Sequence, residues 1–144
     1  MSAGHAGDMS PTEAMEAMRE HSDAQLIDVR TRPEWMFVGM ADTGALGRDP
    51  IPLEWQRYPH MDVDPEFGER LEAELERRGA GKDAPLLFLC RSGARSAAAA
   101  SMMTARGYTR AHNIAGGFEG NPDANGHRGT REGWKAEGLP WKQG

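Results

Sequence analysis

The feature that most constrains the fold of this chain is an apolar run that ends at its only cysteine. Pro85–Leu89 reads PLLFL, the most apolar stretch of the 144 residues, and Cys90 follows it directly. The segment from Arg95 to Arg106 contains four consecutive alanines, which favour a helix, and Gly107 is suited to end it. We therefore expect a buried strand and a helix joined by a short loop that begins at Cys90.

Other segments repeat this alternation of strand and helix. Ser10-Pro11-Thr12-Glu13 is a capping box that starts a helix, and Asp64-Pro65 starts another in the same manner. We expect helices over 11–21, 64–78 and 130–137, and strands over 24–29, 111–115 and near 51–53. This alternation predicts an α/β fold with a central, mostly parallel sheet and helices on both of its faces. Because the chain has the length of one domain, residues 9–144 are expected to form a single domain after a flexible leader, residues 1–8.

The composition excludes several classes of protein. One cysteine permits neither an internal disulfide nor a tetrahedral cysteine zinc site, and the five histidines have no close metal-ligand spacing. No apolar run approaches the roughly 20 residues of a membrane helix. Met1–Asp8 has neither the basic nor the apolar part of a secretory signal. We therefore expect a soluble cytoplasmic protein with no metal and no contact with a membrane.

Charge is unevenly distributed along the chain. The net charge is −5, which argues against a surface that binds nucleic acid. Between Ala84 and Phe118, however, there are four arginines and no acidic residue, so this segment carries +4 and the remainder carries −9. The positive segment contains Cys90, and two of its arginines, Arg91 and Arg95, lie within five residues of that cysteine.

The loop that begins at Cys90 has the residues of a site where a nucleophile meets an anion. Gly93 allows successive backbone N–H groups to turn inward, and the following helix adds its positive N-terminal end. Together with two arginines, these groups favour the thiolate form of Cys90 and hold a small anion. A cysteine that merely fills space in the core would need neither the glycine nor the arginines. The candidate nucleophile is Cys90, and the candidate anion-binding residues are Arg91, Ser92, Gly93, Ala94 and Arg95.

The loop sequence Cys-Arg-Ser-Gly-Ala-Arg-Ser resembles the active-site loop of the rhodanese-like sulfurtransferases. Three further segments match motifs of that family in the expected order: Asp28-Val29-Arg30 with Glu34-Trp35, Ile114-Ala115-Gly116-Gly117-Phe118, and Trp134-Lys135-Ala136-Glu137-Gly138-Leu139-Pro140. The resemblance covers most of residues 10–141 and implies the three-layer rhodanese-like fold.

The resemblance also implies a reaction. Cys90 would take a sulfane sulfur from a small anionic donor such as thiosulfate, and would pass it as a persulfide to cyanide, a thiol or a protein acceptor, without a cofactor. It further implies that Asp28 and Arg30 tie the end of their strand to the loop. Glu34 is then a candidate partner of an arginine, and Ser96 supports the loop. For the first three, an ordinary surface salt-bridge group is an equally good interpretation.

Two other functions remain open at this stage. A cysteine phosphatase usually has a histidine before its cysteine and an arginine after five intervening residues, whereas here Leu89 precedes Cys90 and Arg95 follows after four. A module that binds a partner or relays sulfur between proteins would use exposed aromatic side chains, for which Trp55, Phe118 and Trp141 are the candidates, although core packing is the commoner role.

The sequence departs from the family pattern in two segments. Residues 39–50 replace its Gly-His-Ile-Pro-Gly-Ala segment with a degraded version, and residues 121–129 lengthen the connection before Trp134. We expect both segments near the mouth of the site, where they would affect the choice of substrate.

Overall fold

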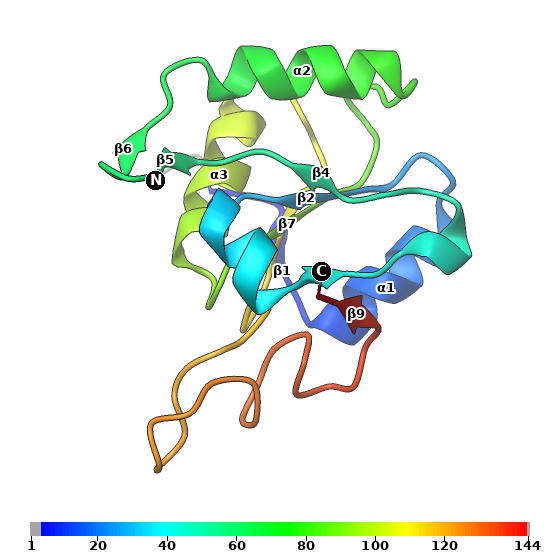
Figure 1. The fold of residues 1–144 in the computed structure, drawn as a ribbon. Helices are drawn as coiled ribbons and strands as arrows, with labels where there is room; N and C mark the ends of the chain where they lie inside the picture. The colour runs from blue at the N-terminus through cyan, green and yellow to red at the C-terminus, as the bar shows by residue number, and fades with distance from the viewer. Residues whose placement is uncertain (1–3, 144) are drawn as a thin grey trace.

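The computed structural model describes residues 4–143 and has a five-stranded, wholly parallel sheet at its centre, in the order β1-β8-β7-β2-β4 (Figure 1). The strands are β1 (Gly7–Met9), β2 (Gln25–Asp28), β4 (Ile51–Pro52), β7 (Leu86–Leu89) and β8 (Ala111–Ile114). The helices are α1 (Pro11–Glu20), α2 (Phe67–Arg77) and α3 (Ala94–Ala105). Helices α2 and α3 cover one face of the sheet, and α1 covers the other (Figure 1). The predicted α/β fold with helices on both faces is confirmed.

Strand β7 explains the three layers. Successive side chains of a strand point to opposite faces of its sheet. Leu86, Phe88 and Cys90 therefore pack in the core beneath α2 and α3, whereas Leu87 and Leu89 pack in a second core with α1. A strand that is buried on both faces needs an uninterrupted apolar sequence, and this is what the PLLFL run supplies.

Smaller elements surround the sheet. They are η1, a turn of π-helix (Glu34–Val38), η2, a turn of 3-10 helix (Gly44–Leu46), and the short strands β3 (Met40–Ala41), β5 (Gln56–Arg57), β6 (Asp62–Val63) and β9 (Trp141–Lys142). Strand β3 pairs with β9, and β5 pairs with β6 as a hairpin, both antiparallel. Within residues 4–143, no helix has the length and the apolar character needed to cross a membrane.

The sequence placed most of the regular elements within about three residues of their bounds. The predicted capping box is present, because the Ser10 hydroxyl accepts from the Glu13 N–H and the Glu13 carboxylate accepts from the Ser10 N–H. Asp64 caps the approach to α2 by accepting from the Glu66 N–H at 2.9 Å.

The helix predicted over 130–137 is wrong, and the flexible leader predicted over 1–8 is wrong in part. Residues 130–137 form turns rather than a helix, because Gly133 has a φ of +101°, which a right-handed helix does not accommodate. The leader assigned to residues 1–8 includes Gly7 and Asp8, which belong to β1 and pair with β8. An edge strand of this kind forms through backbone hydrogen bonds and needs no apolar side chains, which left it without a sequence signal. Residues 1–3 lie outside the described part of the chain.

Candidate active site

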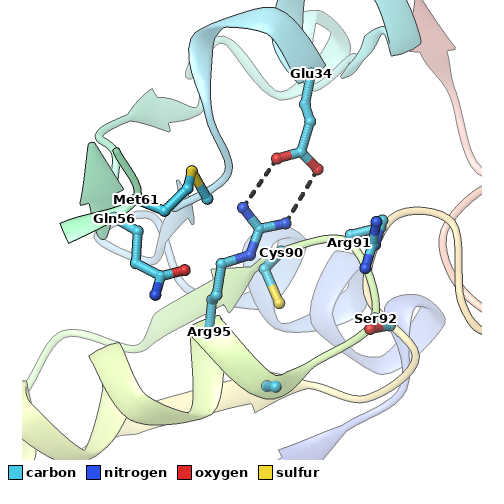
Figure 2. Close-up of a pocket in the computed structure, with 8 residues that line it drawn as sticks. Glu34, Gln56, Met61, Cys90, Arg91, Ser92 and Arg95 are labelled. Atoms are coloured by element: carbon cyan, nitrogen blue, oxygen red, sulfur yellow. Dashed lines mark hydrogen bonds and ion pairs between the residues drawn. The ribbon is translucent and has the colours of Figure 1, made fainter. Parts of the chain in front are cut away.

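Cys90 lies where β7 ends and the loop to α3 begins, next to the carboxyl end of β2. Ligands of open α/β sheets bind at this edge. The residue is 1% exposed, and its thiol points into a pocket of about 340 Å³ (Figure 2). The residues that line the pocket are Glu34, Gln56, Met61, Cys90, Arg91, Ser92, Ala94 and Arg95. The structure thus brings together most of the residues that the sequence assigned to the site.

Backbone and side-chain groups converge on the Cys90 sulfur. The Gly93 N–H donates to Sγ at 3.1 Å, and the Ser96 Oγ lies 3.1 Å from the same atom. Gly93 reaches this position with a φ of +122°, a conformation that side chains disfavour. Within residues 4–143, no side chain caps the start of α3, so its first N–H groups face the loop without a side-chain partner. A negative charge on the sulfur is favoured by this arrangement.

A chain of polar groups continues from Ser96 away from the pocket. The Ser96 Oγ lies 2.5 Å from the Asn113 Oδ1, and the Asn113 amide donates to the Asp8 carboxylate at 3.3 Å. Asn113 lies on β8 and is 5% exposed. The single Ser96 proton has three acceptors within reach, because the Gly93 carbonyl oxygen is also 3.2 Å away. Asn113 therefore influences which way the hydroxyl beside the nucleophile points.

The two arginines of the loop have different surroundings. Arg95 donates to both carboxylate oxygens of Glu34, at 2.9 and 3.0 Å, and both side chains are less than a fifth exposed (Figure 2). Burial disfavours both charges, but the mutual hydrogen bonds and attraction outweigh it, so the pKa of Glu34 is lowered and that of Arg95 is raised. Arg91 is exposed and forms no ion pair with any described residue. The Arg95 charge is thus balanced, and Arg91 is the loop arginine whose charge is available to a ligand.

Asp28 and Arg30 form a buried pair rather than a surface salt bridge. Arg30 is fully buried, donates twice to Asp28 at 2.9 and 2.7 Å, and donates to the Gly39 carbonyl oxygen at 2.8 Å. Its guanidinium lies 4.3 Å from the centre of the Phe118 ring. Since the Phe118 N–H donates to the Cys90 carbonyl oxygen at 2.8 Å, the pair reaches the loop through Phe118 and does not line the pocket.

Sequence reasoning missed Gln56, Met61 and Asn113. Gln56 and Met61 come from the β5–β6 hairpin, whose two-residue strands show no alternating pattern in the sequence. Asn113 is a polar residue within the predicted strand 111–115, and a polar residue in such a strand is the signal that could have found it. The segments 39–50 and 121–129, which were expected at the mouth, supply none of the residues that line the pocket.

The three candidate exposed aromatic residues differ in burial. Phe118 is fully buried, Trp55 is partly buried against Phe67, and Trp141 is 39% exposed. Of these three candidates, only Trp141 therefore presents a large aromatic surface to solvent.

Comparison with known proteins finds a family, a relative and solved structures that this chain resembles. The model of the rhodanese-like domain matches residues 10–121. Rv0390 from M. tuberculosis has a crystal structure that aligns with a TM-score of 0.84 and 44% identity, over 97% of this chain and 99% of that chain. An uncharacterized protein of Rickettsia conorii is 35% identical over 131 residues, which is 91% of this chain and 93% of its own length. The polysulfide-sulfur transferase homodimer from Wolinella succinogenes shares the fold at 24% identity, with a TM-score of 0.59 over 95% of this chain and 78% of that chain.

Proposed function

The chain belongs to the rhodanese-like domain family, a family of sulfurtransferases, and from this premise we propose that it transfers a sulfane sulfur through a persulfide on Cys90. In the first step the Cys90 thiolate attacks the outer sulfur of a thiosulfate-like donor. The sulfur–sulfur bond of the donor breaks, and sulfite leaves with the electron pair. In the second step cyanide or a thiolate attacks the outer sulfur of the persulfide, and Cys90 leaves as a thiolate.

The observation that carries this proposal is the surroundings of the Cys90 sulfur. It is buried at the base of an open pocket, it accepts from the Gly93 N–H, and Ser96 lies at hydrogen-bond distance. These donors suit a thiolate and, after transfer, the negative charge of a persulfide. Arg91 supplies a positive charge at the pocket that attracts an anionic donor.

The same geometry disfavours a phosphatase. A phosphatase needs the loop arginine to bind the oxygens of a phosphoryl group, and here Glu34 binds the Nη1 and Nη2 groups of Arg95 and balances its charge. A relay that exchanges sulfur with another protein is the second candidate. It is favoured by Met36 and Phe37, which are 58% and 73% exposed and follow the pocket residue Glu34 by only two and three positions.

The mass of the intact protein after incubation with thiosulfate tests the proposal. We expect one added sulfur on wild-type protein, removed by cyanide with release of thiocyanate, and no addition to Cys90→Ser. Mercaptopyruvate and an organic persulfide serve as further donors. If Cys90 gains no sulfur from any of the three, the proposed reaction is refuted for small donors. The relay is then tested by mixing the protein with a persulfidated donor protein, from which transfer to Cys90 would be expected.

A further inference from the structure

The pocket above Cys90 is larger than the small ions of the proposed reaction. At about 30 Å³ per heavy atom, the share of a water molecule in the liquid, five-atom thiosulfate fills less than half of the 340 Å³ and two-atom cyanide far less. The remaining volume reaches the β5–β6 hairpin, which carries Gln56 and Met61 to the side of Cys90 away from Arg91 and Ser92 (Figure 2). A larger molecule would therefore contact this hairpin.

The charged side chains of the pocket are paired with one another or lie away from that volume. Glu34 and Arg95 neutralise one another, and Arg91 lies on the side of Cys90 away from the hairpin (Figure 2). Gln56 and Met61 add no charge. Among the described residues, the Gln56 amide makes no hydrogen bond, so both its donor and its acceptor atoms are available to a ligand. Neutral polar groups of a ligand thus match this side of the pocket.

The hairpin is held in place at its base and strained at its tip. The Trp55 ring packs edge-on against Phe67 with ring centres 5.1 Å apart, and the Asp64 N–H donates to the Trp55 carbonyl oxygen at 2.9 Å. Met61 has a φ of +61°, a left-handed conformation that residues other than glycine seldom adopt. Such a conformation persists only where the surroundings enforce it, and it is typical of functional sites. Here it places a polarisable thioether on the pocket wall.

We propose that Gln56 and Met61 determine acceptor specificity, selecting an organic thiol with an amide-bearing body over cyanide. This proposal rests on the persulfide mechanism proposed above. The thiolate RS⁻ attacks the outer sulfur of the Cys90 persulfide, a new S–S bond forms, and the bond to the Cys90 sulfur breaks. The products are the organic persulfide and the Cys90 thiolate, so the sulfane sulfur moves without an external oxidant or reductant. Gln56 binds amide groups of the body, and Met61 packs against its carbon chain.

Acceptor kinetics at fixed thiosulfate test the proposal with three probes: glutathione, which carries amides, 2-mercaptoethanol, which is a thiol without them, and cyanide. We expect Gln56→Ala and Met61→Gly each to raise the KM for glutathione about tenfold, the loss of one good contact. The KM values for 2-mercaptoethanol and cyanide should change less than about twofold. Glycine is chosen because it tolerates the left-handed backbone at position 61, so the fold is retained. Val63→Ala, at an exposed side chain of the same hairpin that does not line the pocket, is the control.

A binding measurement separates this proposal from the reaction itself. S-methylglutathione cannot accept sulfur, and we expect it to slow alkylation of Cys90 by iodoacetamide in wild-type protein but not in Gln56→Ala. Equal changes for glutathione and cyanide, or protection that is unaltered in Gln56→Ala, would overturn the specificity proposal while leaving the persulfide reaction intact. Failure of Cys90 to gain sulfur would refute the reaction, and the protection experiment would still decide whether the hairpin binds an amide-bearing ligand.

Discussion

The two walls of the Cys90 pocket are built in different ways. One wall is the continuous segment 90–95, which joins the central strand to the following helix. The facing wall is assembled from Glu34, Gln56 and Met61, which come from separate segments of the chain. The first wall holds the proposed nucleophile, and the second holds the residues proposed to choose the acceptor. The residues proposed to react thus come from one stretch of sequence, whereas those proposed to select the acceptor come from several.

The two walls also differ in what holds them. The loop is fixed by backbone hydrogen bonds, since Cys90 and Arg91 carbonyl oxygens accept from the N–H groups of residues 118–120 at 2.8 to 3.0 Å. The facing wall contacts the loop through side chains, above all the Glu34–Arg95 pair. A substitution that creates a steric clash with the backbone should therefore displace the first wall most. A substitution that removes a charge should destabilise the second wall most.

The largest effect is expected from Gly117→Ala. A Cβ at this position would lie 2.5 Å from the Cys90 carbonyl oxygen and 2.6 Å from that of Arg91, and the φ of +62° disfavours a side chain as well. The loop must move to admit it, and displacement of a reacting group by about 1 Å lowers a rate about a hundredfold. Thiocyanate formation from thiosulfate and cyanide measures the loss.

Gly126→Ala is the matched control for that substitution. Its φ is +78°, yet a Cβ there would meet nothing within 4 Å. Gly126→Ala should therefore lose only about 1 kcal/mol of stability, from the backbone conformation, as measured by urea unfolding, and Gly117→Ala should lose more because of its contact with the loop. Only Gly117→Ala should lose activity. Equal activity in the two variants would show that the loop is not held in place by its contact with Gly117.

Glu34→Gln should destabilise the protein by about 1–3 kcal/mol, because it leaves the largely buried Arg95 charge without its partner. The effect should depend on pH. Since the pKa of Glu34 in the folded protein lies below its ordinary value of 4.5, the stabilisation is complete above about pH 5. It is lost as the pH falls through the lower folded value, so the difference from wild type shrinks toward pH 3.

Glu66→Gln provides the comparison with an exposed pair. Glu66 contacts Arg70 at 2.9 Å, but their side chains are 62% and 50% exposed. Pairs of this kind contribute about 0–1 kcal/mol. Urea unfolding of wild type, Glu34→Gln and Glu66→Gln between about pH 3 and 7 would compare the two stability losses. A Glu34→Gln variant as stable as Glu66→Gln would mean that the facing wall does not depend on its ion pair.

The contiguous wall was predictable from the sequence, and the reasons are local. An apolar run buried on both faces, a glycine, and an alanine-rich helix occur within about 20 consecutive residues. Each of these signals depends on nearest neighbours only. Cys90, the loop and the strand–helix unit could thus be placed without knowledge of the rest of the chain.

The facing wall was not predictable, because it depends on long-range contacts. Strands β5 and β6 have two residues each, too few for an alternating pattern, and the position of Met61 depends on the hairpin as a whole. Glu34 was expected to meet an arginine, but the sequence could not show that this arginine is Arg95. Because that pairing balances the charge of Arg95, the anion site has one available loop arginine, Arg91, where the sequence predicted two.

The smallest effect is expected from Asn113→Ala, which changes a residue that supports the first wall without lining the pocket. Asn113 does not line the pocket, so it acts on the nucleophile only by holding the Ser96 hydroxyl. Its removal takes away the contact that fixes the Ser96 side chain, so the hydroxyl is no longer held 3.1 Å from the Cys90 sulfur. We expect persulfide formation to slow about three- to tenfold, the value of one hydrogen bond.

The division of this effect between kcat and KM identifies its origin. A positioning residue outside the pocket should lower kcat and leave the KM for thiosulfate unchanged, whereas a collapsed loop would change both. Asn125→Ala, in an exposed loop, is the control and should change neither. If Asn113→Ala raises KM as much as it lowers kcat, then the segment 90–95 both reacts with the donor and determines how tightly it binds. The two walls would then differ only in how they are built, one from a continuous segment and the other from separate segments, and not in their roles.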